Sequence, residues 1–325
     1  MKTRFRRVAA CALGAALAAG GMSKVGLADP LRVGKPQAEL FSFLPLDVGM
    51  QEGIFKKHGI EVQEFDLGGA AKLQQALTAD GIDIGLGSGP ALSFIAKGAP
   101  QLGIAEMAGP PLVLTLIVAK DGPVKTVADL KGKTVSISSP GGVLEWMLRQ
   151  LSQHEGWGPD GINMIGLGTD SAQIAALRTG QIVGMPMDIG IASKLEDEGI
   201  ARIIVRFGDI APTFIMHVIF ATDDVMQKRP DDLKKFLAGW FETIRFMNAN
   251  KAEAVRIGTG VMHLPPETAG RVYDAAMPMF SETGRFDPKA TAILAKSFVE
   301  LKMLPTEPDM TKLYTERFLP AGATK

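Results

Sequence analysis

Short apolar runs alternate with amphipathic stretches along the chain, a pattern that is typical of α/β proteins. The first half predicts, in order, strand 31–34, helix 46–57, strand 61–67, helix 70–79, strand 82–84 and strand 112–119. The second half predicts strand 134–138, helix 143–153, strand 214–221, and helices from residue 230 and at 252–257, 266–276 and 288–301. Gly59 is expected to end the helix at 46–57 in a left-handed cap.

One segment of this pattern occurs twice. Residues 66–77 recur as residues 166–177, and Leu67 and Gly68 are matched by Leu167 and Gly168. Each copy combines a strand, a glycine turn, an amphipathic helix and a short strand. Since one such unit cannot bury both faces of its sheet, two copies predict two similar α/β lobes. Ligands of open α/β sheets bind beyond the carboxyl ends of the strands, so we expect a cleft between the lobes.

The amino terminus has the pattern of a secretory signal peptide. Basic residues precede an apolar stretch at 8–19, which is too short to span a bilayer, and Gly26-Leu27-Ala28 offers small residues for cleavage. We therefore expect residues 1–28 to be removed and the mature chain to begin at Asp29. The only cysteine, Cys11, lies in this leader, so we expect neither a disulfide nor thiol chemistry in the mature protein.

Charge narrows the range of partners. The whole chain has 35 basic and 35 acidic residues, and the leader holds five basic residues and no acid, so the mature chain carries a net charge of −5. A mildly acidic protein is poorly suited to binding nucleic acid or an anionic membrane. No apolar segment after the leader is long enough to be inserted into a membrane.

Four segments carry a resemblance to a known family. In chain order they are EGIFKKHGIEVQEF, GGAAKLQQALTADGIDIG, SGPALSFIAKGAP and VADLKGKTVSISSPGG. They resemble the substrate-binding proteins of bacterial ABC importers, in the subgroup that binds sulfonates, taurine, nitrate and pyrimidine precursors of thiamine. The resemblance covers residues 31–319. It implies a type II periplasmic-binding-protein fold, with two α/β lobes, two crossing strands near 112–119 and 214–221, and a ligand cleft between the lobes. We expect residues 29–115 and 216–325 to form lobe I and residues 116–215 to form lobe II.

The candidate ligand contacts are the turns at the strand ends, where backbone N–H groups can reach a ligand. They are Ser42, Phe43, Gly68, Gly69, Ser88 and Gly89 in lobe I, and Ser138, Ser139, Gly141, Gly142, Met187 and Asp188 in lobe II. Three alternatives stay open: Phe43 as a core residue, Gly68-Gly69 as a plain tight turn, and Asp188 as a helix N-cap. Gly141, Gly142 and Val143 stand where the sulfonate and nitrate binders of this family tend to place serine or threonine, which counts against an oxyanion ligand.

Catalytic chemistry has little support in the sequence. The four histidines show no metal-ligand spacing, and Gly87-Ser88-Gly89 lacks the spacing of a nucleophile elbow. We therefore expect no catalytic residue, no metal and no cofactor. The resemblance favours a monomeric periplasmic protein that captures a small anionic or heteroaromatic nutrient and delivers it to an ABC permease and its ATPase. The alternative is a secreted enzyme or sensor component built on the same fold.

Overall fold

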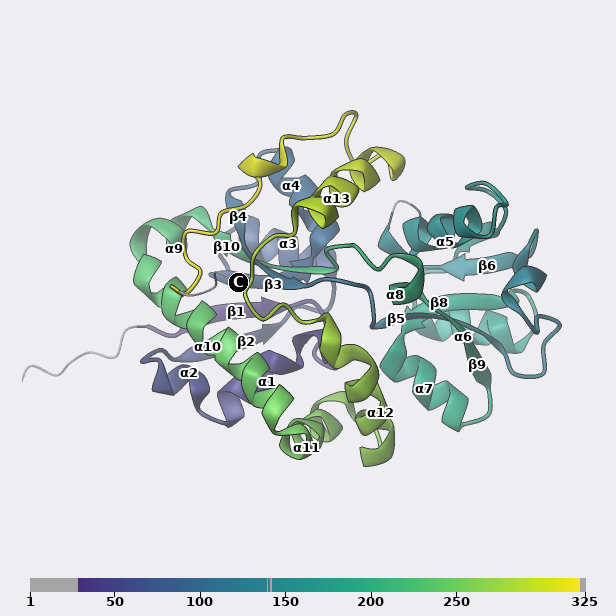
Figure 1. The fold of residues 1–325 in the computed structure, drawn as a ribbon, viewed down its shortest axis with the longest axis horizontal. Helices are drawn as coiled ribbons and strands as arrows, with labels where there is room; N and C mark the ends of the chain where they lie inside the picture. The colour runs from purple at the N-terminus through teal and green to yellow at the C-terminus, as the bar shows by residue number, and fades with distance from the viewer. Residues whose placement is uncertain (1–28, 139, 141, 322–325) are drawn as a thin grey trace, which may run out of the picture.

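The strands of the computed structural model, which describes residues 29–138, 140 and 142–321, form two five-stranded sheets. Sheet A has the order β2-β1-β3-β10-β4 and sheet B the order β7-β6-β8-β5-β9 (Figure 1). The strands are β1 Leu31–Lys35, β2 Val62–Asp66, β3 Ile84–Ser88, β4 Gln101–Ala108, β5 Leu114–Ala119, β6 Thr134–Ile137, β7 Asn163–Gly166, β8 Gly184–Asp188, β9 Ala201–Arg206 and β10 His217–Thr222.

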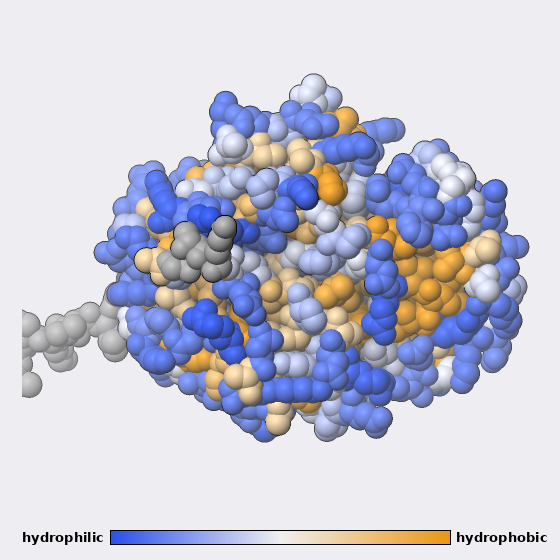
Figure 2. All heavy atoms as spheres, in the orientation of Figure 1, coloured by the Kyte–Doolittle hydropathy of each residue, from blue (hydrophilic) through white to orange (hydrophobic). Residues whose placement is uncertain are grey.

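Helices surround both sheets (Figure 1). Those before β10 are α1 Leu44–Gln51, α2 Ile54–Lys57, α3 Ala70–Thr78, α4 Leu92–Ala96, α5 Val143–His154, α6 Asp170–Arg178, α7 Ile189–Asp197 and α8 Phe207–Ile210. Those after β10 are α9 Asp223–Lys228, α10 Pro230–Ala249, α11 Lys251–Met262, α12 Pro266–Ala276 and α13 Pro288–Glu300. Hydrophilic side chains cover much of the outer surface, and apolar ones gather on the visible face of the sheet B lobe (Figure 2).

Each sheet contains a strand that enters from the other lobe. β5 follows β4 of sheet A in sequence but lies antiparallel between β8 and β9. β10 follows β9 of sheet B but lies antiparallel between β3 and β4. The chain therefore crosses twice, at residues 109–113 and 207–216, and the predicted fold of two α/β lobes with two crossings is confirmed.

The crossings differ in detail from the sequence-based expectation. The segments expected to cross, 112–119 and 214–221, mostly lie inside the sheets as β5 and β10, and the crossings come just before them. The expected lobe boundary at residue 115 falls inside β5, because Leu114 and Thr115 already pair with β8.

The two copies of the sequence repeat occupy matching places. The first copy forms β2, α3 and β3 in sheet A, and the second forms β7, α6 and β8 in sheet B. Gly68 and Gly168 both take a left-handed backbone, with φ of 65° and 75°. Ile82 and Ile182, the apolar pair just before the last strand, are each 1 % exposed. The repeat thus predicts one unit in each lobe, as observed.

The predicted helix at 46–57 is wrong in one respect, because it consists of two helices. α1 ends at Gln51, and α2 starts at Ile54 after Gly53, whose φ of 67° lies outside the helical region. A left-handed residue interrupts the hydrogen-bond ladder of a helix. The expected left-handed cap at Gly59 is confirmed, with a φ of 73°.

Carboxyl-terminal helices join the lobes outside the crossings. In α12, Thr268 Oγ1 and Arg271 Nη2 each lie 2.6 Å from a carboxylate oxygen of Asp197 at the end of α7. On the other flank, Trp146 of α5 donates its indole N–H to Glu300 of α13 at 2.7 Å. These polar contacts hold the two lobes in register on either side of the crossings.

Replacement of Gly89 by alanine tests the packing at the second crossing. A Cβ at this position would overlap the carbonyl oxygen of Ile215, and the Gly89 amide already donates to Met216 O at 2.9 Å. Because backbone must shift to make room, we expect Gly89→Ala to lower the free energy of unfolding by about 1–3 kcal/mol. Gly260→Ala in α11 is the control, since a Cβ there meets nothing within 4 Å. Equal stability of the two variants by urea denaturation would contradict the close approach.

Candidate functional site

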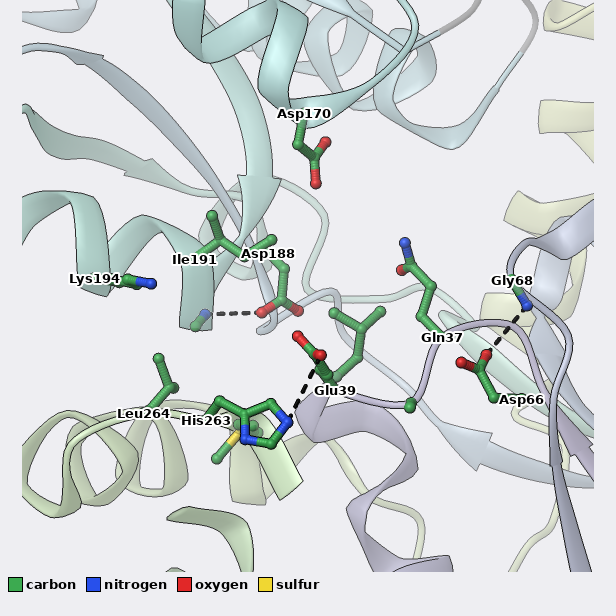
Figure 3. A pocket seen from close by; sticks show the side chains of 14 residues that line it. Gln37, Glu39, Asp66, Gly68, Asp170, Asp188, Ile191, Lys194, His263 and Leu264 are labelled. Carbon is green, nitrogen blue, oxygen red and sulfur yellow. Dashed lines mark hydrogen bonds and ion pairs between the residues drawn. The ribbon is translucent and has the colours of Figure 1, made fainter. Parts of the chain in front are cut away.

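A cavity of about 430 Å³ lies between the lobes, at the ends of strands from both sheets. Loops from three parts of the chain on the sheet A side and two on the sheet B side converge on it (Figure 3). Its lining consists of Gln37, Ala38, Glu39, Leu40, Asp66, Gly68, Asp170, Asp188, Gly190, Ile191, Lys194, Met262, His263 and Leu264. This volume is within the range of small-molecule sites.

The sheet A side of the cavity is formed by connections that follow β1, β2 and α11. Residues 37–40 link β1 to the turn before α1, and Asp66 ends β2. Asp66 Oδ1 accepts a hydrogen bond from the Gly68 amide at 3.1 Å, which fixes the turn into α3. His263, at φ 52° between α11 and α12, places its Nε2 3.8 Å from Glu39 Oε1.

The sheet B side consists of two helix starts. Asp170 is the first residue of α6, which Thr169 caps by accepting from the Ala172 amide. Asp188 ends β8 and caps α7, where its Oδ1 accepts from the Gly190 amide at 2.8 Å. The carboxylates of Asp170, Asp188 and Glu39 all point toward the space between the lobes (Figure 3).

Burial raises the pKa of the two carboxyl groups on the sheet B side. It is the main cause that raises the pKa of Asp188 to about 7, while the hydrogen bond from Gly190 opposes this rise and the nearby charge of Asp170 adds to it. Partial burial also raises the pKa of Asp170 above its usual range, although its side chain stays exposed. The charge of Asp170 therefore disfavours the ionised form of Asp188. A positive group between them would relieve that cost.

Two of the sequence-predicted residues line the cavity. Gly68 does so from the first repeat unit and Asp188 from the end of β8. Asp188 is thus both the N-cap and a cavity residue, which joins the two alternatives that the sequence left open. Gly69 caps α3 next to this wall with a φ of 144°. Ser42, Phe43 and Met187 are at most 3 % exposed, and Phe43 packs edge-on against His217.

The remaining predicted contacts lie at the other strand ends. Ser88 is half-buried at the end of β3, and Gly89 is buried with its amide bonded to Met216. Ser138 is exposed after β6, where its carbonyl accepts from the Gly168 amide at 3.0 Å, and half-buried Gly142 caps α5. Ser139 and Gly141 lie outside the described residues, as do Cys11 and the leader.

Sequence reasoning missed several cavity residues. Asp170 had a signal, because it occupies the place in the second repeat that Ala70 occupies in the first. Gln37 and Glu39 follow the first strand, in the same connection as the predicted Ser42. The sequence gives no signal for His263, Leu264 and Lys194, because only the packing of α12 against α7 brings these residues to the cleft.

Comparison with known proteins identifies the family. The model of the family described as NMT1/THI5 like matches residues 41–254, more than half of the chain. The chain belongs to this family. A Haemophilus influenzae protein whose name assigns it to thiamine biosynthesis is 31 % identical over 108 residues. That match covers 32 % of this chain and 34 % of the relative, so it spans about a third of the relative's length.

Solved structures share the whole fold at low identity. The periplasmic aliphatic sulphonate-binding protein SsuA of Escherichia coli is 19 % identical over 89 % of this chain and 92 % of its own, with a TM-score of 0.75. SsuA of Xanthomonas axonopodis pv. citri, bound to MOPS, is 19 % identical over 88 % of this chain and 98 % of its own, with a TM-score of 0.72. The desulfurization enzyme DSZB is 13 % identical over 90 % of this chain and 97 % of its own, with a TM-score of 0.67.

These neighbours show the periplasmic-binding-protein fold, which serves binding proteins and at least one enzyme. Within the described residues, none of the helices has the length and apolarity needed to cross a bilayer. In the same part of the chain, no three His, Cys, Asp or Glu side chains come together as a metal site.

The raised pKa of Asp188 predicts a pH-dependent effect of Asp188→Asn. The carboxyl binds its proton more tightly in the folded state, so ionisation costs stability as the pH rises from about 4 to 7. Asparagine removes this cost and keeps an acceptor for the Gly190 amide. We expect the variant to be more stable than the wild type by about 1–2 kcal/mol at pH 8, with the gain shrinking toward pH 4.

The measurement is urea denaturation across this pH range. The control is Asp231→Asn, at an 80 % exposed carboxylate on α10. If the difference in stability between Asp188→Asn and the wild type stays constant with pH, the raised pKa of Asp188 is refuted.

Proposed function

We propose that this chain is a secreted solute-binding protein that holds one small molecule between its lobes. It delivers that molecule to an ABC permease and its ATPase, without changing it chemically. The leader at 1–28 directs it to the periplasm, and the mature protein acts as a monomer. The observation that carries this proposal is the cavity, because residues from both lobes line it.

A cavity shared by two lobes gives the ligand a mechanical effect. Each lobe alone offers only part of the contacts, so a molecule that touches both favours the closed arrangement. The connections at 109–113 and 207–216 are the only covalent links between the sheets among the described residues, and rotation about them opens or closes the cleft. The contact of α12 with Asp197 lies beside the cavity and adds to the closed state.

A second candidate function is an enzyme, which the similarity to DSZB favours. Against it stands the composition of the described cavity wall. The wall contains carboxylates, Lys194 and His263, but no serine, threonine, tyrosine or cysteine. His217, the most buried histidine, packs against Phe43, and burial lowers its pKa to about 3. A histidine with so low a pKa is a weak base and is poorly suited to accept a proton in catalysis.

Capture of a molecule from cell extract tests the proposal. Mature protein is incubated with the small-molecule extract of its own cells and washed, and the bound molecule is released by denaturation and analysed by mass spectrometry. We expect one molecule per chain, identical to a compound in the extract. Release of a converted product would favour the enzyme, and an empty protein would contradict both functions.

Variants locate the captured molecule. Ile191 lines the cavity, so Ile191→Trp should fill part of its volume and lower the captured amount at least tenfold. Val299→Trp places the same bulk on α13 at a 36 % exposed position outside the cavity wall and should capture as the wild type does. Circular dichroism confirms that both variants are folded. Undiminished capture by Ile191→Trp would place the site elsewhere.

A further inference from the structure

The ionisable side chains of the cavity are mostly acidic. Four carboxylates line it, from Glu39, Asp66, Asp170 and Asp188, against one lysine and one histidine. His263 lies 3.8 Å from Glu39, so a positive charge on it is offset first by that carboxylate. Three aspartates then face the cavity with Lys194 as the remaining cation of the wall. The field inside such a cavity attracts positive charge.

Acidic groups also stand at the helix ends where an anion would bind. α3, α6 and α7 all begin at the cavity, and a helix amino terminus ordinarily attracts an anion. Here Asp188 accepts a hydrogen bond from the Gly190 amide of α7, and Asp170 is the first residue of α6. Before α3, Asp66 accepts a hydrogen bond from the Gly68 amide, in the turn that precedes the N-cap Gly69. Each helix start therefore already has a carboxylate of the protein beside it.

Nearby lysines do not reverse this balance. Lys72 of α3 is exposed, with its Nζ 3.7 Å from the position that a Cβ of Gly68 would take. Lys35, at the end of β1, is 1 % exposed and lies 2.9 Å from Asp47 and 2.8 Å from Glu64. Two carboxylates thus already face its single charge. Even with Lys72 and a protonated histidine included, the acids remain in the majority.

The rest of the wall is apolar and fits an organic molecule. Leu40, Ile191, Met262 and Leu264 contribute side chains from both lobes. A molecule with an apolar body can pack on these residues while its polar end lies near Asp170 and Asp188. An inorganic ion would leave that apolar surface without a partner.

We propose that the cavity selects an organic cation, in which a protonated amine or amidine is attached to an apolar body, and that it rejects sulfonates. The inference rests on the proposed function and specifies its ligand. The positive nitrogen lies between Asp170 and Asp188, and the apolar body lies against Ile191 and Leu264. The chain thereby differs from its structural neighbour SsuA, whose name describes a sulphonate binder.

Matched probes of opposite charge test the proposal. Benzamidine is compared with benzenesulfonate and butylamine with butanesulfonate, together with calcium chloride, by thermal shift and then calorimetry on the mature protein. We expect at least one of the two organic cations to raise the melting temperature, and both sulfonates and calcium to leave it unchanged. The dissociation constant of the organic cation that binds should rise about tenfold or more in the Asp188→Asn variant and in the Asp170→Asn variant. Asp231→Asn, at an exposed site on α10, should bind as the wild type does.

Several results would overturn the proposal. They are binding of either sulfonate, binding of calcium alone, binding of no organic cation, and full affinity in a double Asp170→Asn, Asp188→Asn variant. The capture experiment distinguishes failure of the organic-cation proposal from failure of the proposed solute-binding function. An unchanged captured molecule without positive charge would refute the cation and leave solute binding intact, whereas an empty protein would refute solute binding itself.

Discussion

The exchange of one strand between the two sheets determines the arrangement of this molecule. β5 completes sheet B although it follows a strand of sheet A, and β10 completes sheet A although it follows a strand of sheet B. Each exchanged strand is hydrogen-bonded on both sides, so neither lobe can form without chain from the other side of the crossing. The close approach of Gly89 to Ile215 lies where the second crossing enters sheet A. The exchange therefore keeps the strand ends of both sheets facing a common cleft.

That geometry brings helix amino termini together, and the side chains then decide what the cleft binds. A helix start ordinarily favours an anion, but here a carboxylate of the protein stands near each of the three. Asp66, Asp170 and Asp188 stand at those starts, and burial between the lobes raises the pKa of the last two. Asp170 and Asp188 both belong to the sheet B side, and Asp66 lines the cavity from the sheet A side. The proposed cation offsets the repulsion between Asp170 and Asp188, and its apolar body contacts Leu264 of the other lobe, so one ligand engages both lobes.

Much of the fold could be predicted from the sequence, because it rests on local patterns. The repeat predicted one unit in each sheet, and Gly59 took the left-handed backbone that was predicted for it. Gly53 broke a predicted helix because apolar spacing does not report a single residue with positive φ.

The site was less accessible to sequence reasoning. Gly68 and Asp188 lie in the cavity wall, but Phe43 and Met187 are buried, since strand-end position does not reveal which way a side chain turns. His263 and Leu264 reach the cavity only through the packing of α12 on α7, more than sixty residues away in sequence. No local pattern encodes that contact.

The most direct test of this account is a crystal structure of the mature protein with the molecule that it captures from cell extract. We expect density for one molecule in the cavity between the lobes, with a nitrogen within hydrogen-bond distance of Asp188 and contacts to both lobes. A molecule bound outside this cavity, or held by one lobe alone, would contradict it.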